Sequence, residues 1–380
     1  MRRLAVATFV LFIAFGCVDR LYFDIDSPDR YGISISGHVT NDAGPHRVNI
    51  FRNFDVESKD SLKTGVSALH VTISDAEGNS TELSQVKSGI YETQPDALVG
   101  KQGGIYKVTI EFEDGRTYES VPDTLPVGGV IDTSYYKFVG HPDVGGFVYD
   151  YQIYVKSSTQ ADLTKTFFMW SNKMTYKAKT NPQAEIHPPC YPVADNPTVC
   201  NFVAPCTGLK NVGNNWNIVY EYVGPCTCCV CWYDQYSKSI VLSDAYNSNN
   251  GMFPEIQVDR IEQTGWNMMY KMRIEASMQS ITLQAYRFWK AVRDQRSATT
   301  NIFQPITGKI RGNIIQTKGP DSPVEGIFYT TSLHQKVFYI LRGDTPIDRI
   351  PSLDFPNAGA YPCQRLAPYA VNEPPSYWID

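Results

Sequence analysis

The sequence has few features of an integral membrane protein or a nucleic-acid-binding protein. Its one long uncharged apolar run covers residues 4–15. About a dozen residues are too few to cross roughly 30 Å of hydrocarbon as a helix. Lysine and arginine total 34 against 39 aspartates and glutamates, so the formal net charge is −5. Binding to nucleic acid needs a basic surface. We therefore expect neither a membrane-spanning body nor a nucleic-acid partner.

The common catalytic motifs are also missing. The chain has no G-x-S-x-G elbow, Walker loop, H-E-x-x-H or G-x-G-x-x-G. Its six histidines are scattered, and His70 falls in a strand pattern where a structural role is more usual than that of a base. Two carboxylates at a suitable separation can hydrolyse a glycoside, so a glycan-active enzyme remains an alternative. We expect no enzymatic activity, no cofactor and no metal ion.

The first residues resemble an export signal. Arg2 and Arg3 precede the apolar run, which has the length of a secretory signal core and ends in Ala14-Phe15-Gly16-Cys17. A small residue before cysteine is typical of a lipoprotein cleavage site. We predict a signal peptide over residues 1–16 and lipidation of Cys17, the alternative being an ordinary signal peptide with a chance cysteine. Cleavage removes two arginines and takes the net charge from −5 to −7.

A lipidated Cys17 would anchor the mature chain stably to a membrane. A single acyl chain gives only marginal membrane binding, whereas two or more acyl chains bind stably. Residues 17–32 then form a tether with four aspartates, Asp19, Asp24, Asp26 and Asp29. Asp24, Asp26 and Asp29 could bind calcium, but they lack the glycine and distal glutamate of an EF-hand loop, so a solvated linker is favoured.

The composition favours a mainly β fold. Aromatic residues make up 13% of the chain, with 24 tyrosines, 27 glycines and 24 prolines, as expected of many short strands joined by turns. Residues 33–126 suggest an immunoglobulin-like β-sandwich. The clearest hairpin lies at 103–121, where Tyr106, Val108, Ile110 and Phe112 alternate with polar neighbours and Asp114-Gly115 makes the turn.

Residues 131–380 are predicted to form a larger β-rich domain with one packed helix. Long alternating strands open it, and residues 308–315 and 326–343 together suggest three strands. The helix is expected near 280–297, capped by Ser280 or Thr282. An apolar stripe should face the core, and for Trp289 packing is favoured over stacking on a ligand. The stripe comprises Leu283, Tyr286, Phe288, Trp289 and Val292.

Apart from Cys17, eight cysteines remain, most of them in an irregular segment at about 181–234. They are Cys190, Cys200, Cys206, Cys226, Cys228, Cys229, Cys231 and Cys363. An exported chain lives where disulfides persist, so all eight are disulfide candidates. The two C-x-x-C spacings also suit zinc or a redox centre. If residues 226–231 are extended, however, Cys226 and Cys228 point to one face of the strand and Cys229 and Cys231 to the other. This arrangement favours disulfides to different neighbouring segments over a single metal site.

Several segments in order resemble the domain-of-unknown-function 4249 family of Bacteroidota outer-membrane lipoproteins. The resemblance covers nearly the whole mature chain. Two departures are Gln304, where an aspartate before the proline is more usual, and the dense cysteine cluster. The segments that carry the family resemblance include residues 36–50, 65–79, 103–120, 277–295, 301–314 and 326–340.

This resemblance implies a lipid-anchored protein of the outer membrane, which we expect at the cell surface, encoded beside a TonB-dependent transporter. By analogy with lipoproteins that cap such transporters, the expected role is an accessory or ligand-capture partner of the barrel. The alternative is a structural or assembly lipoprotein of an envelope complex without a small-molecule ligand.

Overall fold

The computed structural model describes most of the chain after the predicted tether. The described residues are 32–52, 64–144, 146–180, 205–212, 219–243, 249–298, 310–345, 363 and 370–379. The predicted signal peptide, residues 17–31 of the tether, Cys17, Cys190 and Cys200 lie outside them.

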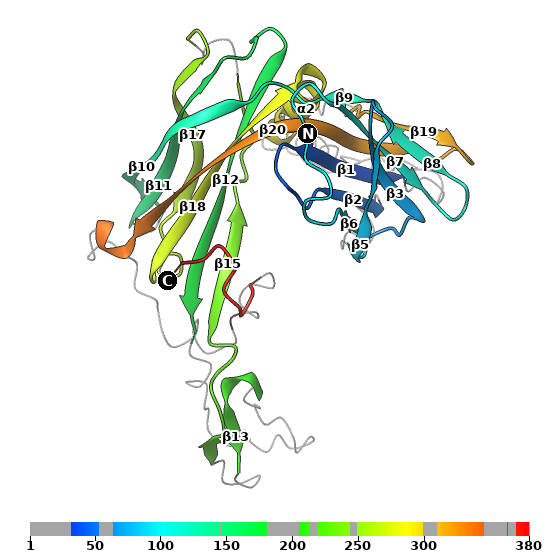
Figure 1. Ribbon diagram of the computed structural model, residues 1–380. Helices are drawn as coiled ribbons and strands as arrows, with labels where there is room; N and C mark the ends of the chain where they lie inside the picture. The colour runs from blue at the N-terminus through cyan, green and yellow to red at the C-terminus, as the bar shows by residue number, and fades with distance from the viewer. Residues whose placement is uncertain are drawn as a thin grey trace, which may run out of the picture.

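The fold is mainly β, as predicted, and has two lobes that meet beside helix α2 (Figure 1). Among the described residues, α2 at Leu283–Ala298 is the one α-helix. No helix in this part of the chain has the length and apolarity needed to cross a membrane.

The first lobe consists of two sheets. One contains β1, β2, β6 and β5 in that order, and the other has the order β19-β8-β7-β3-β4, with β9 beside β7. Their bounds are β1 Ile33–Thr40, β2 Arg47–Arg52, β3 His70–Asp75, β4 Ser80–Glu82, β5 Ser84–Lys87, β6 Ile90–Glu92, β7 Ile105–Glu111, β8 Thr117–Ser120, β9 Asp123–Thr124 and β19 Ile314–Lys318.

One apolar core joins these two sheets. Ile35 and Ile50 of the first sheet and Val108 and Ile110 of the second are completely buried in it. In β7 the buried positions alternate as predicted, and Gly115 makes the turn to β8 with a φ of +85°. The sandwich arrangement therefore follows from strand alternation. The immunoglobulin-like classification stays a prediction.

Strand β20, at Val324–Leu341, belongs to both lobes. Its first half pairs in parallel with β1, from Ile33↔Val324 to Thr40↔Thr331. Its second half pairs antiparallel with β18, from Ser280↔Ser332 to Lys271↔Leu341. The two strands predicted within 326–343 are thus one continuous strand. The predicted range 33–126 also lacks β19 and the first half of β20, which complete the first lobe.

The second lobe also has two facing sheets. One is the other end of the large sheet, with the order β15-β12-β18-β20 and β16 beside β12, and the other is β10-β11-β17. A small pair, β13-β14, precedes β15. Their bounds are β10 Gly129–Asp143, β11 Gly146–Thr159, β12 Thr166–Lys179, β13 Leu209–Asn211, β14 Tyr220–Tyr222, β15 Val230–Tyr236, β16 Val241–Leu242, β17 Met252–Glu262 and β18 Lys271–Thr282.

Even-numbered residues of β12 and β18 face the interior of this lobe. Trp170 and Met278 pack there against Phe253 of β17, and Met174 and Ile274 form a neighbouring cluster. The odd-numbered residues of both strands consequently lie on the opposite, outer face of the large sheet.

Helix α2 covers one end of that outer face. The hydroxyl of Thr282 accepts a hydrogen bond from the amide of Ala285 at 3.5 Å, so Thr282 caps the helix, while Ser280 accepts one from the amide of Gly129. Trp289 packs edge-on against Tyr329 of the sheet, as the packing interpretation predicts. The predicted stripe was wrong at Leu283, which is 38% exposed, because the fully buried position of the first turn is Ala285.

Candidate functional site

Three disulfides organise the segment that leads into β15. They join Cys206 to Cys228, Cys226 to Cys229, and Cys231 to Cys363. The prediction of disulfides is confirmed for these six cysteines, whose sulfurs are therefore not free to ligate zinc. Among the described residues, no group of three histidines, cysteines or carboxylates lies together as a metal site.

The first two disulfides stabilise a projecting arm. We define this arm as residues 205–212 and 219–229, which include the β13-β14 pair seen at the bottom of Figure 1. The bond from Cys206 to Cys228 is reinforced by a hydrogen bond from the amide of Thr227 to the Cys206 carbonyl at 2.8 Å. The chain bends between Cys226 and Cys229, whose Cα atoms are 5.6 Å apart, and is not extended there.

The third disulfide holds the C-terminal segment against β15. Cys231 and Cys363 are both completely buried. Farther along, Trp232 and Val371 exchange two backbone hydrogen bonds of 2.9 and 3.0 Å. In Figure 1 the red C-terminal segment lies against β15 and β18. The edge of the large sheet is thereby covered, which removes part of an exposed pairing edge.

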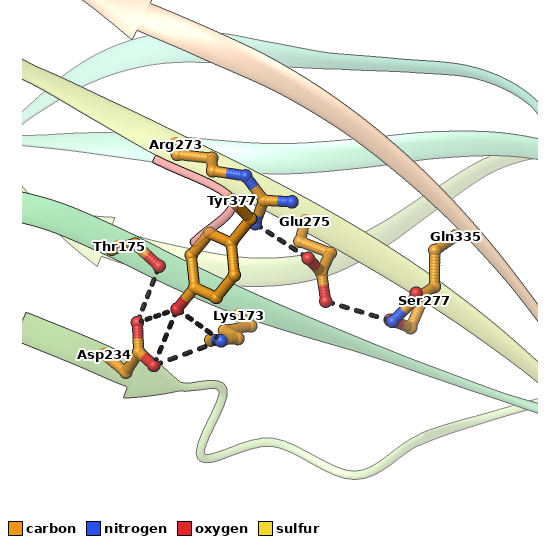
Figure 2. Close-up of polar contacts among 8 residues, drawn as sticks. All are labelled: Lys173, Thr175, Asp234, Arg273, Glu275, Ser277, Gln335 and Tyr377. Atoms are coloured by element: carbon orange, nitrogen blue, oxygen red, sulfur yellow. Dashed lines mark hydrogen bonds and ion pairs between the residues drawn. The ribbon is translucent and has the colours of Figure 1, made fainter. Parts of the chain in front are cut away.

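A polar cluster lies on the outer face of the large sheet, where Tyr377 of this segment contacts it (Figure 2). Its members come from four strands, β12, β15, β18 and β20, and from the C-terminal segment. They are Lys173, Thr175, Asp234, Arg273, Glu275, Ser277, Gln335 and Tyr377.

Half of the cluster is centred on Asp234. Its carboxylate accepts hydrogen bonds from Thr175 at 2.7 Å and from the Tyr377 hydroxyl at 2.9 Å. It also lies 3.0 Å from Nζ of Lys173, which in turn donates to the Tyr377 hydroxyl at 2.7 Å. Burial lowers the pKa of Lys173, but the hydrogen bonds to Tyr377 and Asp234 outweigh burial and raise that pKa above its usual value.

The other half is centred on Glu275. Arg273 donates to one carboxylate oxygen at 2.7 Å and Gln335 to the other at 3.0 Å. The Arg273 side chain is only 8% exposed, and its guanidinium carbon lies 4.6 Å from the centroid of the Tyr377 ring. Tyr377 therefore links the two halves by its hydroxyl and by its ring.

This arrangement fastens the chain end to the sheet. Both carboxylates face a cation and accept further hydrogen bonds, as partly buried charges require. Lys271 continues the pattern, because its Nζ donates to the carbonyl of Ile379 and lies 5.3 Å from the Trp378 ring. The alternation of polar residues at 173 and 175 and at 273, 275 and 277 was the sequence signal for this surface. It was missed because Tyr377 lies far away in the chain.

The structure also places His70. It lies at the start of β3, exposed, with Nδ1 2.7 Å from Oε1 of Glu82, and this hydrogen bond raises its pKa. It is remote from the polar cluster, which comes from other strands.

The chain belongs to a family described as a domain of unknown function, DUF4249, which it matches over residues 19–336. The match runs through both lobes and ends within the shared strand β20. No curated protein is similar enough to the chain to count as a match.

Proposed function

We propose that this protein is a lipid-anchored protein of the outer membrane, exposed at the cell surface, that serves as an accessory or ligand-capture partner of a TonB-dependent transporter. The proposal includes the absence of enzymatic activity. The single observation that carries it is the start of the chain. An apolar run of signal-core length ends at Gly16-Cys17, and the family match begins two residues later, at 19.

The arm supports the partner role. Val219 is 44% exposed and Val223 is 61% exposed, and both lie on a disulfide-stapled element that projects from the second lobe. Exposed apolar side chains on a rigid projecting element are typical of protein-binding surfaces. Such staples also suit a chain that works outside the reducing cytoplasm.

The test is a pull-down from the native envelope in mild detergent, followed by mass spectrometry. Because Tyr377 and Ile379 are bound to the sheet, the tag belongs after a flexible linker beyond Asp380 or in the exposed turn at Gly78. We expect a TonB-dependent barrel in stoichiometric amount with either tag. Recovery of the protein alone, or with anchoring and assembly proteins only, would overturn the proposal and favour the structural alternative.

A matched pair of variants then tests the arm. Val223→Asp should abolish co-purification of the barrel, since it places a charge on the contact surface. Val86→Asp changes a valine of similar exposure, 51%, on β5 of the first lobe and should leave recovery unchanged. Equal recovery with both variants would remove the arm from the interface.

A further inference from the structure

The outward side of α2 forms a groove that is separate from both the polar cluster and the arm. The groove has a volume of about 780 Å³ and lies between the helix and residues 310–311, which precede β19. This volume falls in the range of small-molecule sites, roughly 300–1,000 Å³. Among the described residues, its lining combines four apolar side chains and two cations with the amide side chain of Gln284. They are Leu283, Phe288, Ala291 and Ile310, with Arg287 and Arg311.

Part of the apolar lining is not used in packing the helix against the sheet. The helix residues Ala285, Tyr286, Phe288 and Trp289 belong to the apolar cluster against the sheet, and Phe288 also lines the groove. Leu283 lies on the other side of the first turn, is 38% exposed and lines the groove instead. A large aliphatic side chain left at a concave surface next to Phe288 favours an apolar ligand, because covering it removes apolar area from water.

Among the described residues, the two arginines have no neutralising partner. In the part of the chain that the structure describes, neither Arg287 nor Arg311 forms an ion pair or a side-chain hydrogen bond. The neighbouring cations on the same helix differ, because Lys290 lies 2.8 Å and Arg293 3.1 Å from Asp294. An acidic chain that keeps two unpaired guanidinium groups at one groove has a local site for an anion.

We propose that this groove binds a free anionic amphiphile, a molecule with one carboxylate or phosphate group and an apolar chain. The acid group lies at Arg287 and Arg311, since a guanidinium matches both kinds of oxyanion with paired hydrogen bonds. The apolar chain lies against Leu283, Phe288 and Ile310. This inference gives the ligand-capture part of the proposed function a chemical class and rests on that proposal only for its biological setting.

The experiment uses the full mature chain, residues 17–380, with Cys17→Ser so that no detergent is needed. Detergent is itself an amphiphile and would compete. Isothermal titration calorimetry with monomeric dodecanoate and dodecyl phosphate should show one site for each probe. Dodecanol lacks the acid group and should bind at least tenfold more weakly. Acetate lacks the apolar chain and should give no signal. Each methylene removed from the dodecanoate chain should weaken binding about fourfold.

Substitutions assign the site. Arg287→Gln and Arg311→Gln should each weaken dodecanoate binding about tenfold. Lys290→Gln removes a charge from the same helix outside the groove and should change nothing. Equal binding of dodecanol and dodecanoate, wild-type affinity in both arginine variants, or binding to phosphatidylglycerol vesicles without binding of monomeric probes would each overturn the proposal. Co-purification of the barrel is measured separately, so the two proposals fail independently.

Discussion

Lys173 of β12 donates a hydrogen bond to the hydroxyl of Tyr377 at 2.7 Å, although 204 residues separate them in the chain. The same hydroxyl donates to Asp234 of β15. One side chain near the C-terminus thus connects two strands of the large sheet, which makes the chain end part of the second lobe.

Replacing Tyr377 by phenylalanine should destabilise the second lobe. The change keeps the ring beside Arg273 but removes the hydroxyl shared by Lys173 and Asp234. Hydrogen bonds to charged groups contribute about 1.5–3 kcal/mol, and partial exposure of Asp234 reduces this, so we expect a loss of about 1–2 kcal/mol. Urea unfolding measures it. Tyr236→Phe is the control, because Tyr236 is 66% exposed. An equal effect of the two variants would contradict the fastening role.

The disulfides should differ in their effect on stability according to the loops that they close. Cys231 and Cys363 are 132 residues apart, whereas Cys226 and Cys229 are three apart. On the loop-entropy account, losing the first bond costs about 4–5 kcal/mol and losing the second about 2 kcal/mol. Paired cysteine-to-alanine variants compared by urea unfolding under non-reducing conditions test this. A smaller loss for the long-range pair would show that the C-terminal segment is held by other contacts.

Mild acid should destabilise the protein through His38. Burial, with a smaller contribution from repulsion by His46, lowers the pKa of His38 from 6.5 to about 4. Between these values the unfolded chain binds a proton that the folded chain does not, so stability falls as pH falls. We expect a loss of about 1–2 kcal/mol from pH 7 to pH 5.

His38→Phe supplies the control for this pH dependence. It keeps a ring next to Tyr329, whose centroid lies 5.4 Å from that of His38, but does not titrate. The variant should lose less stability over the same interval. His70, whose pKa is raised, contributes with the opposite sign in both proteins and cancels in the comparison. Identical pH profiles would show that His38 takes up its proton in the folded state.

The shared strand should make the two lobes unfold together. Phe328 of β20 is completely buried in the core of the first lobe, and Phe328→Ala should cost about 3–5 kcal/mol. Because β20 continues into the second lobe, hydrogen exchange should accelerate in β12 and β18 as well as in β3 and β7. Faster exchange confined to the first lobe would mean that the lobes open independently.

Local patterns predicted much of this fold. Alternation and Asp114-Gly115 predicted the β7-β8 hairpin, and apolar spacing predicted the helix to within three residues at its start. The hairpin and the helix are both formed by contacts between residues that are close together in the sequence. The pairing of β1 with β20 is not, because Ile33 and Val324 meet only after the intervening chain has folded.

The candidate sites were harder to predict for the same reason. Cysteine count and export predicted disulfides, but eight cysteines allow 105 pairings, and spacing does not choose among them. The bend that brings Cys226 to Cys229 contradicts an extended run. Tyr377 lies in a proline-rich tail with no periodicity, so its contact with Lys173 has no local signal.

The measurement that tests the central claim most directly is the mass of the N-terminal peptide of the native protein. The proposed membrane location, the transporter partner and the oxidising environment of the arm all depend on the processing of Cys17. We predict a mature chain that begins at Cys17 and carries a diacylglyceryl group on sulfur and a third acyl chain on the amine. A chain that starts elsewhere, or a Cys17 without lipid, would contradict the account.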